Sequence, residues 1–235
     1  MNKYKIAGLI VEMEPEYELL KTRSEKYLTN DESDADIVIS LPHGFAEAKH
    51  KELPHLSAAD CEYLWSGVEF YSVLPKYDGI LLHSSCVAVD GKAYLFSAPC
   101  GTGKSTHTQL WQKYFGEKLV FVNDDKPALR IIDGKVYACG TPFSGKTALN
   151  SDVSFPLQGI CILSRDEKNH IHKMEMSDAL PKILSQTFRP KNKVLMLKVL
   201  EILDKIVSEV PVYSLHCNME IDAVLTSYNG MNGKI

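Results

Sequence analysis

Short apolar runs of strand length fill the middle of the chain, and longer runs with helical spacing follow toward its end. Apolar residues flank Asp90-Gly91 and again Asp133-Gly134. Each pair predicts a β-hairpin, because both residues of such a tight turn must accept positive φ. Hairpins pair strands antiparallel, whereas a purely parallel sheet needs a crossover helix between neighbours. The pattern therefore predicts an α/β fold with a mixed β-sheet.

Helices and further strands are predicted on both sides of these hairpins. Apolar residues recur at helical spacing through 57–74, and Ser57 followed by Asp60 indicates an N-terminal cap. Helical periodicity also covers 177–188, 191–209 and 221–228. Strand-forming runs cover 5–11, 35–40, 118–122 and 211–217, and the segment 156–176 suggests two more strands. Residues 1–75 are expected to form a small α/β lead-in. Without a Pro/Gly/Ser-rich linker, it should pack directly on a core of residues 76–235.

A glycine-rich turn joins the strand-forming run "KAYLF" to the helical run "THTQLWQKYF". Glycines let successive backbone N–H groups converge on phosphate oxygens, and the following helix adds its unpaired N–H groups and positive dipole end. A lysine there can reach the β- and γ-phosphates, and a hydroxyl suits Mg²⁺. Ala98 stands where the usual first glycine of a P-loop lies, so the entry to the loop is expected to differ. The candidate nucleotide-binding residues are Gly101, Thr102, Gly103, Lys104, Ser105 and Thr106.

Two adjacent aspartates, Asp124 and Asp125, end the apolar run "KLVFV". Strand ends carry ligand sites in α/β sheets, and a strand tipped by carboxylates beside a phosphate loop is a familiar source of a second Mg²⁺ contact. Neighbouring side chains of an extended segment point to opposite sides. The two carboxylates are therefore expected to differ in role, one near the metal and one free to accept a proton.

Composition narrows the classes of partner. The chain has 235 residues, 45% of them apolar, with a formal net charge of −4 and no Arg/Lys-rich tract. A nucleic-acid binder would be expected to show a basic excess, so no nucleic-acid partner is predicted. The six cysteines are scattered without metal-ligand spacing, and the first apolar run is too short for a signal peptide or membrane span. A cytoplasmic location and no membrane partner are therefore expected.

The segment "LHSSCVAVDGKAYLFSAPCGTGKST", followed by "NDDKPAL", resembles the catalytic domain of bacterial HPr kinase/phosphatase, and more closely its smaller relatives. The resemblance covers about residues 76–150 well. It implies a core similar to that of phosphoenolpyruvate carboxykinase, with the P-loop on a mixed sheet. It also implies an ATP- and Mg²⁺-dependent kinase acting on an acceptor hydroxyl. The family's glycine-rich signature after the second carboxylate strand is not recognisable here, so phosphorylation of HPr itself is not implied.

Site residues follow from the same resemblance. It places the phosphate-loop lysine at Lys104 and the metal-binding hydroxyl at Ser105. Asp124 then resembles the general base and Asp125 the metal-side partner, while His83 falls on the histidine expected to orient or tune Asp124. On its own, a histidine in an apolar strand is more often a hydrogen-bonded core residue. Lys146, in the small-residue loop 140–150, is a weaker candidate for a phosphate or substrate contact, since it could equally be a solvated loop lysine.

The function predicted from the sequence is a kinase that transfers the γ-phosphoryl group of ATP to a hydroxyl, with serine favoured, of a protein, peptide or small molecule. The competing hypothesis is an ATP-binding regulator or sensor that transfers nothing. Such a sensor has no need of a general base, so the two aspartates and His83 favour the kinase. Phosphoenolpyruvate carboxykinase chemistry is weaker, since 235 residues leave little room for that enzyme's substrate apparatus. The identity of the acceptor, the base preference, reversibility and the oligomeric state stay open.

Overall fold

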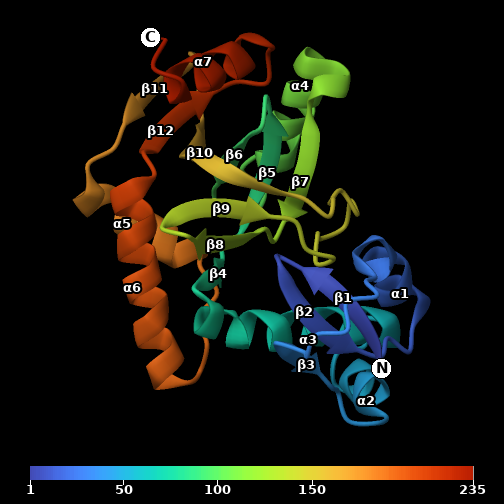
Figure 1. The fold of residues 1–235 in the computed structure, drawn as a ribbon. Helices are drawn as coiled ribbons and strands as arrows, with labels where there is room; N and C mark the ends of the chain where they lie inside the picture. The colour runs from blue at the N-terminus through green and yellow to red at the C-terminus, as the bar shows by residue number, and fades with distance from the viewer. Residues whose placement is uncertain (235) are drawn as a thin grey trace.

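The fold is taken from a computed structural model that describes residues 1–234. A small three-stranded sheet with its helices lies at one end, and a larger mixed sheet with helices on both faces makes up the rest (Figure 1). Antiparallel hairpins and parallel neighbours occur in the larger sheet, so the predicted mixed sheet is confirmed. Within the described residues, no helix is both long and apolar enough to cross a membrane.

The N-terminal unit departs from the sequence prediction at its first strand. The run 5–11 was predicted as one strand, but Ala7 and Gly8 both adopt positive φ, 52° and 77°, and turn the chain into a hairpin. Ser57 does cap a helix, in a capping box with Asp60 as predicted. The elements of this unit are β1 (Asn2–Ile6), β2 (Leu9–Met13), α1 (Glu18–Ser24), β3 (Ile37–Ile39), α2 (Phe45–Glu52) and α3 (Ala58–Val73).

The larger sheet runs in the order β4-β8-β9-β10-β6-β5-β7, with β12 and then β11 added beside β10. The long strand β10 pairs first with β9 and then lies between β6 and β12, parallel to both, so it joins the two halves of the sheet. Its strands are β4 (Gly79–Leu81), β5 (Ser84–Val89), β6 (Lys92–Ser97), β7 (Val120–Asp125), β8 (Ala128–Ile132), β9 (Lys135–Cys139), β10 (Ser154–Arg165), β11 (His170–Lys173) and β12 (Val212–Cys217). Its helices are α4 (Lys104–Phe115), α5 (Met176–Gln186), α6 (Lys193–Glu209) and α7 (Asp222–Met231).

Both predicted hairpins form in this sheet. Asp90 and Gly91 have φ of 51° and 75° between β5 and β6, and Asp133 and Gly134 have φ of 49° and 79° between β8 and β9. The two strands expected within 156–176 are β10 and β11, but β11 pairs with β12 rather than with β10. The predicted C-terminal helices correspond to α5, α6 and α7, with ends shifted by a few residues.

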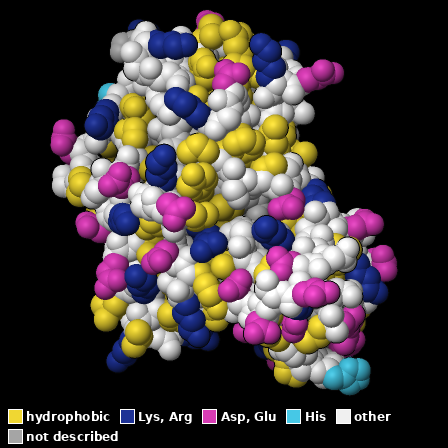
Figure 2. Space-filling view, in the orientation of Figure 1, with side chains coloured by type: hydrophobic (Ala, Val, Ile, Leu, Met, Phe, Trp, Pro, Cys, Tyr) yellow, Lys and Arg dark blue, Asp and Glu magenta, His cyan; other side chains and the backbone are white. Residues whose placement is uncertain are grey.

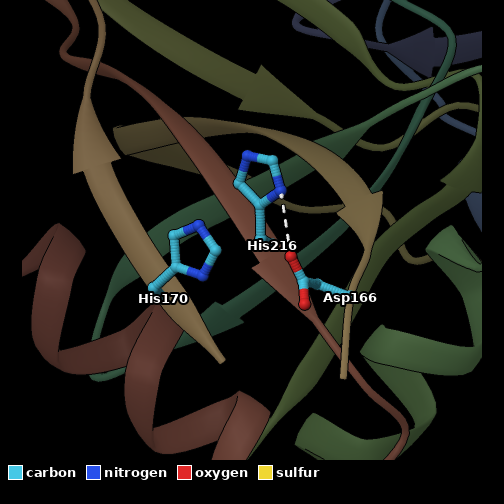
Figure 3. Close-up of side chains that lie close together, drawn as sticks. All are labelled: Asp166, His170 and His216. Carbon is cyan, nitrogen blue, oxygen red and sulfur yellow. Dashed lines mark ion pairs between the residues drawn. The ribbon is translucent and has the colours of Figure 1, made fainter. Parts of the chain in front are cut away.

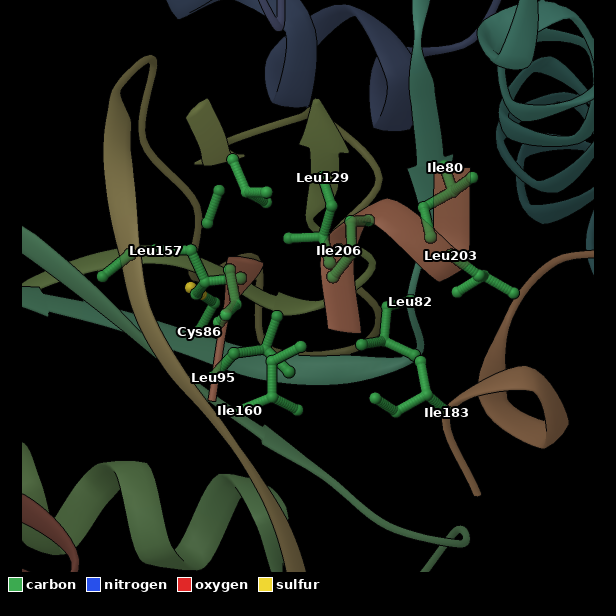
Figure 4. Close-up of a cluster of buried hydrophobic side chains, with 14 of the residues drawn as sticks. Ile80, Leu82, Cys86, Leu95, Leu129, Leu157, Ile160, Ile183, Leu203 and Ile206 are labelled. Carbon is green, nitrogen blue, oxygen red and sulfur yellow. The ribbon is translucent and has the colours of Figure 1, made fainter. Parts of the chain in front are cut away.

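Two hydrophobic clusters cover opposite faces of the larger sheet. Along β5, Cys86 and Ala88 belong to one cluster and Val87 and Val89 to the other, as the two-residue period of a strand requires. The first cluster packs under α5 and α6 and includes Leu95, Ile160, Ile183, Leu203 and Ile206 (Figure 4). The second lies under α4 and α7. Because both faces are covered, the strands are apolar throughout rather than alternating.

A third cluster joins the N-terminal unit to the sheet. It includes Tyr27 and Phe70 from the first 75 residues together with Leu81, Cys139 and Phe143 from the core. The hydroxyl of Tyr27 also donates to Asn150 Oδ1 at 2.9 Å. The N-terminal unit therefore rests on β4, on the end of β9 and on loop 140–150, the edge of the sheet where the candidate site lies.

Candidate functional site

The glycine-rich loop joins β6 to α4, in the strand–turn–helix order that the sequence predicts. Gly101 and Gly103 have φ of 78° and 121°, a region that side-chain-bearing residues rarely adopt, although nothing lies within 4 Å of a Cβ at either position. Backbone conformation rather than space therefore demands glycine here. Thr102 closes the turn by donating its backbone N–H and its hydroxyl to the Pro99 carbonyl, at 3.3 and 2.9 Å.

Lys104 opens α4 and is buried within this loop. Its Nζ donates to the Ala98 carbonyl at 3.0 Å. Burial lowers the pKa of Lys104, while the nearby charges of Asp125, Cys100 and Asp124 act in the opposite sense. Ser105 and Thr106 follow in the first turn of the helix and face the same cavity. Ala98 is itself buried, and its carbonyl, which holds Lys104, occupies the entry of the loop.

Arg165 supports the loop from outside and was missed by the sequence analysis. It donates to the carbonyls of Gly101, at 2.5 Å, and Thr102, at 3.0 Å. It ends β10, which runs parallel to β6 with Ile162 opposite Ser97, so the end of β10 comes level with the loop. A polar residue ending an apolar strand was the available signal, because carboxyl ends of parallel strands meet at one edge. That β10 and β6 are neighbours could not be read from the chain.

Asp124 lies on β7 and is almost entirely buried. Its Oδ2 accepts a hydrogen bond from the Thr147 hydroxyl at 2.9 Å. Among the described residues, Asp124 Oδ1 is the one buried side-chain oxygen or nitrogen without a hydrogen-bond partner. An unpaired buried carboxylate oxygen is costly, so it marks a position suited to a cation or a donor.

Asp125 has quite different surroundings. His83 Nε2 lies 3.2 Å from its Oδ1, and Lys126 contacts its Oδ2. Burial alone would raise the pKa of Asp125, but the His83 hydrogen bond and the Lys126 charge outweigh it and lower the pKa to about 2. His83 was expected beside Asp124, but its ion-pair contact is with Asp125, because His83 precedes Ser84, which pairs with Asp125 across β5 and β7. The other ring nitrogen of His83 lies 3.0 Å from Gln186 Oε1.

Loop 140–150 closes over the carboxylates. Gly145 has φ of 66°, and a Cβ there would lie 2.9 Å from Asp125 Cβ, so glycine is required twice over. Arg23 of α1 donates to the Gly145 carbonyl and to the Tyr63 hydroxyl, and its guanidinium lies 4.6 Å from the Tyr63 ring centre. Lys146, the weaker candidate, is exposed at the rim. The N-terminal unit thus holds this loop, a role that the sequence analysis did not predict.

These groups surround one cavity of about 730 Å³. It is lined by most of the candidates that the sequence named: Gly101, Gly103, Lys104, Ser105 and Thr106 of the loop, His83, both aspartates and Lys146. Thr102 lines the neighbouring cavity instead. Five basic side chains among the described residues meet three acidic ones there. The basic residues are Arg23, Lys104, Lys126, Lys146 and Arg165, and the acidic ones are Asp60, Asp124 and Asp125. On the outer face in view, charges of both signs are interspersed (Figure 2). Although the whole chain is acidic, the cavity has the charge balance of a site for an anion.

Two further cavities adjoin this one at opposite sides. One of about 530 Å³ shares Gly103, Thr106 and Arg165 with it and has apolar walls from Leu110 and Leu163. The other, of about 210 Å³, shares Tyr63 and Lys126 with the central cavity, along with Leu56 and Leu64, and is lined almost wholly by apolar atoms. The central cavity therefore has one neighbour beside the glycine-rich loop and another beside the N-terminal unit.

Comparison with known proteins finds similarity to solved structures but not to curated sequences. No family model and no curated protein sequence matches the chain. The HPr(Ser) kinase/phosphatase of Coxiella burnetii aligns with 66% of this chain and 95% of its own, at 11% sequence identity and a TM-score of 0.36. At these values the similarity is distant and carries no argument about activity. The support for a function therefore comes from the residues of the cavity.

Proposed function

We propose that the protein is a Mg²⁺-dependent phosphotransferase that moves the γ-phosphoryl group of ATP to an acceptor hydroxyl. The observation that carries this proposal is the unpaired, buried Oδ1 of Asp124, a residue that lines one cavity with Lys104, Ser105 and the glycine-rich loop. A cation beside a phosphate loop would satisfy that oxygen. A turn without such a role would gain nothing from burying a carboxylate there.

The triphosphate would lie along the loop. Gly101 and Gly103 leave the loop amides free to approach phosphate oxygens, and the start of α4 adds its unpaired N–H groups. Lys104 would exchange the Ala98 carbonyl for a phosphate oxygen. Since the carboxylates lie on one side of the loop, the nucleoside belongs on the other. The cavity with walls from Leu110 and Leu163 is there, and it is large enough for a purine nucleoside.

Ser105 and Asp124 are the residues that fit Mg²⁺, a cation that prefers oxygen ligands and is commonly held by one or two carboxylates with substrate phosphates. When bound, Mg²⁺ would neutralise charge on the β- and γ-phosphate oxygens. This assignment exchanges the roles expected from the sequence, since Asp124 has the free oxygen whereas both oxygens of Asp125 are engaged by His83 and Lys126.

Asp125, held in place by His83, is then the group placed to accept the acceptor's proton. Its carboxylate would hydrogen-bond the hydroxyl and take the proton as the hydroxyl oxygen bonds to phosphorus, and the imidazole at 3.2 Å would fix the orientation of that carboxylate. A carboxylate with a pKa of about 2 is a weak base, which suits a reaction where the proton leaves late and positioning provides most of the rate. Lys126 and Lys146 would offset charge on the transferring phosphoryl group.

The acceptor would enter from the side of the N-terminal unit. The apolar cavity of about 210 Å³ lies beside α3 and shares Tyr63 and Lys126 with the cavity that holds the carboxylates. A protein, peptide or small molecule with an apolar group next to its hydroxyl would bury that group there, gaining about 25 cal/mol for each Å² covered. The serine hydroxyl of a peptide remains the favoured acceptor.

The test is transfer of label from γ-labelled ATP in the presence of Mg²⁺. Acceptors should include free serine, small hydroxylated metabolites, HPr, and serine peptides with and without a bulky apolar neighbour. Lys104→Ala provides the blank, and Lys113→Ala, on the last turn of the same helix, provides a matched control that should retain transfer. Label in an acceptor, absent with Lys104→Ala, supports a kinase.

An ATP-binding regulator without transferase activity is the alternative. It would bind ATP with the same loop and the same Mg²⁺ dependence. It would leave all acceptors unlabelled, and Asp125→Asn would change neither binding nor any downstream readout. Nucleotide binding without transfer across the full acceptor panel would therefore replace the kinase by this alternative.

A further inference from the structure

A cluster of metal-ligating side chains lies on the larger sheet, apart from the residues assigned above. Asp166 follows the end of β10, His170 begins β11, and His216 lies near the end of β12 (Figure 3). One ligand atom from each can be chosen so that all three lie within 4.8 Å of one another. Three neighbouring strands thus bring a carboxylate and two imidazoles to one point, although the residues span fifty positions of the chain.

The sheet register places the two histidines together. His170 is directly opposite His216 in the antiparallel β11–β12 pair, and the ring centres are 4.4 Å apart with planes 6° from parallel. The carboxylate Oδ2 of Asp166 lies 3.8 Å from His216 Nδ1. Because β-strands fix these positions, little backbone entropy would be lost when a ligand joins the three side chains.

Neighbouring hydrogen-bond partners can hold each histidine in a tautomer with one lone pair free for a metal. His170 Nδ1 lies 3.2 Å from the Lys168 carbonyl, which can only accept, so Nδ1 is the protonated nitrogen and Nε2 has the free lone pair. Ser214 Oγ lies 3.2 Å from His216 Nε2 and can accept its N–H, which leaves Nδ1 toward Asp166. Ser164 Oγ also approaches that Nδ1, at 2.9 Å, and can turn to the Leu215 carbonyl instead. Partners of this kind orient histidine ligands of metals.

From this arrangement we infer that Asp166, His170 and His216 form a binding site for a transition-metal cation of the Zn²⁺ class. Two imidazoles and a carboxylate suit Zn²⁺ and leave a fourth position for water, whereas Mg²⁺ and Ca²⁺ prefer all-oxygen sets. Tetrahedral Zn²⁺ separates its nitrogen ligands by about 3.3 Å, so the side chains need to contract by about 1.5 Å or less. Both ring planes must also contain the ion, which requires the exposed His170 ring to turn about χ2, a soft torsion.

The bound ion would link the ends of three strands beside the glycine-rich loop. Asp166 directly follows Arg165, whose guanidinium holds the Gly101 and Thr102 carbonyls, and Asp166 also lines the cavity of about 530 Å³. Zn²⁺ would therefore fasten β10 to β11 and β12 where Arg165 leaves the sheet. The site itself depends only on the three side chains and stands whether or not the protein is a kinase.

The test uses the full chain without an affinity tag, since a histidine tag would bind the metal. Zn²⁺ affinity is measured by competition with a chromophoric chelator, and the donor atoms by X-ray absorption at the zinc edge. His170→Ala and His216→Ala each remove a ligand, and Asp166→Asn weakens the third. The matched control is His43→Ala, because His43 Nδ1 also lies 3.8 Å from a carboxylate, that of Glu16, without a second histidine in its group.

The expected result is one equivalent of Zn²⁺ with two imidazole donors in the parent protein and in His43→Ala. Affinity should fall by about tenfold or more in each ligand variant. At a hundredfold excess of Zn²⁺ over the parent Kd, the parent Tm should rise by about 5–10 °C, and the Tm of each ligand variant should rise by about half as much or less. Circular dichroism checks that the variants are folded. Absence of stoichiometric binding, or equal affinity in the parent and the ligand variants, would overturn the site.

Discussion

Asp124→Asn and Asp125→Asn should change the free energy of unfolding in opposite directions, although the two residues are adjacent. The change is almost isosteric and removes one negative charge in both cases. Asp124 has a buried oxygen without a partner, whereas Asp125 is held by His83 and Lys126. Without Mg²⁺ or nucleotide, Asp124→Asn should therefore stabilise the fold and Asp125→Asn should destabilise it.

The magnitudes follow from these contacts. Asparagine keeps an acceptor for Thr147 and leaves an amide N–H unpaired where the carboxylate oxygen was. An unpaired neutral group costs about 1–3 kcal/mol and an unpaired charged group costs more, so the substitution should give a net gain of about 1 kcal/mol. The pKa of Asp125 falls from 3.8 to about 2, which at about 1.36 kcal/mol per unit corresponds to about 2 kcal/mol. Ionised Asp125 contributes this stabilisation in full above the unfolded pKa, and the contribution disappears as pH falls toward the folded pKa. The asparagine variant therefore lacks all of it at pH 7.

Thermal unfolding at pH 7.5 in EDTA measures both effects. For a chain of this size, Tm should rise by about 2–4 °C in Asp124→Asn and fall by about 4–8 °C in Asp125→Asn. Excess Mg²⁺ with a non-hydrolysable ATP analogue should then raise the Tm of the parent much more than that of Asp124→Asn. The reasoning is refuted if both variants shift Tm in the same direction by similar amounts.

Three further changes probe the loop, the carboxylate cover and the core. Gly145→Ala places a Cβ 2.9 Å from Asp125 Cβ, so kcat for transfer should fall on the order of 10²-fold with little change in nucleotide Kd. Gly91→Ala, with the same positive φ but open space around it, is the control, and an equal loss in both would contradict the argument. Arg165→Ala frees the Gly101 and Thr102 carbonyls and should raise the nucleotide Kd about tenfold by calorimetry. Arg189→Ala changes an exposed arginine and should leave the nucleotide Kd unchanged. Equal nucleotide affinities in the parent, Arg165→Ala and Arg189→Ala would contradict the role of Arg165 in supporting the loop. Burial lowers the pKa of His107 to about 3 in the folded protein, whereas its unfolded pKa is about 6.5. The neutral ring therefore costs nothing above about pH 6.5, and the free energy of unfolding declines as pH falls below that value. Between pH 7 and 5 the parent should lose about 2 kcal/mol that His107→Gln does not, by urea unfolding, and parallel pH profiles would refute this.

Local signals in the sequence predicted the elements that local chemistry determines. Asp-Gly pairs gave both hairpins of the larger sheet, and Ser57 with Asp60 gave the start of α3. The Ala7-Gly8 turn was missed, because alanine rarely adopts positive φ and the run around it is apolar throughout. The candidate residues of the glycine-rich loop and of β7 were also chosen from local signals, and the structure places most of them around one cavity.

The contacts of the candidate site that the sequence did not predict depend on pairings between distant segments of the chain. His83 reaches Asp125 through the register of β5 with β7, and Arg165 reaches the loop through the parallel pairing of β10 with β6. Arg23 and Tyr63 come from a unit whose packing against loop 140–150 leaves no mark in the sequence. The exchange of roles that we propose for Asp124 and Asp125 has the same origin, because adjacent residues differ only in what the fold places beside them.

The most direct test is the electron density of a crystal grown with Mg²⁺ and a non-hydrolysable ATP analogue. The account predicts phosphates along residues 101–106, Mg²⁺ bound by Ser105 Oγ and Asp124 Oδ1, and the γ-phosphate facing the Asp125–His83 pair. The nucleoside should occupy the cavity beside Leu110 and Leu163. A nucleotide bound elsewhere, or a metal that leaves Asp124 Oδ1 without a partner, would contradict it.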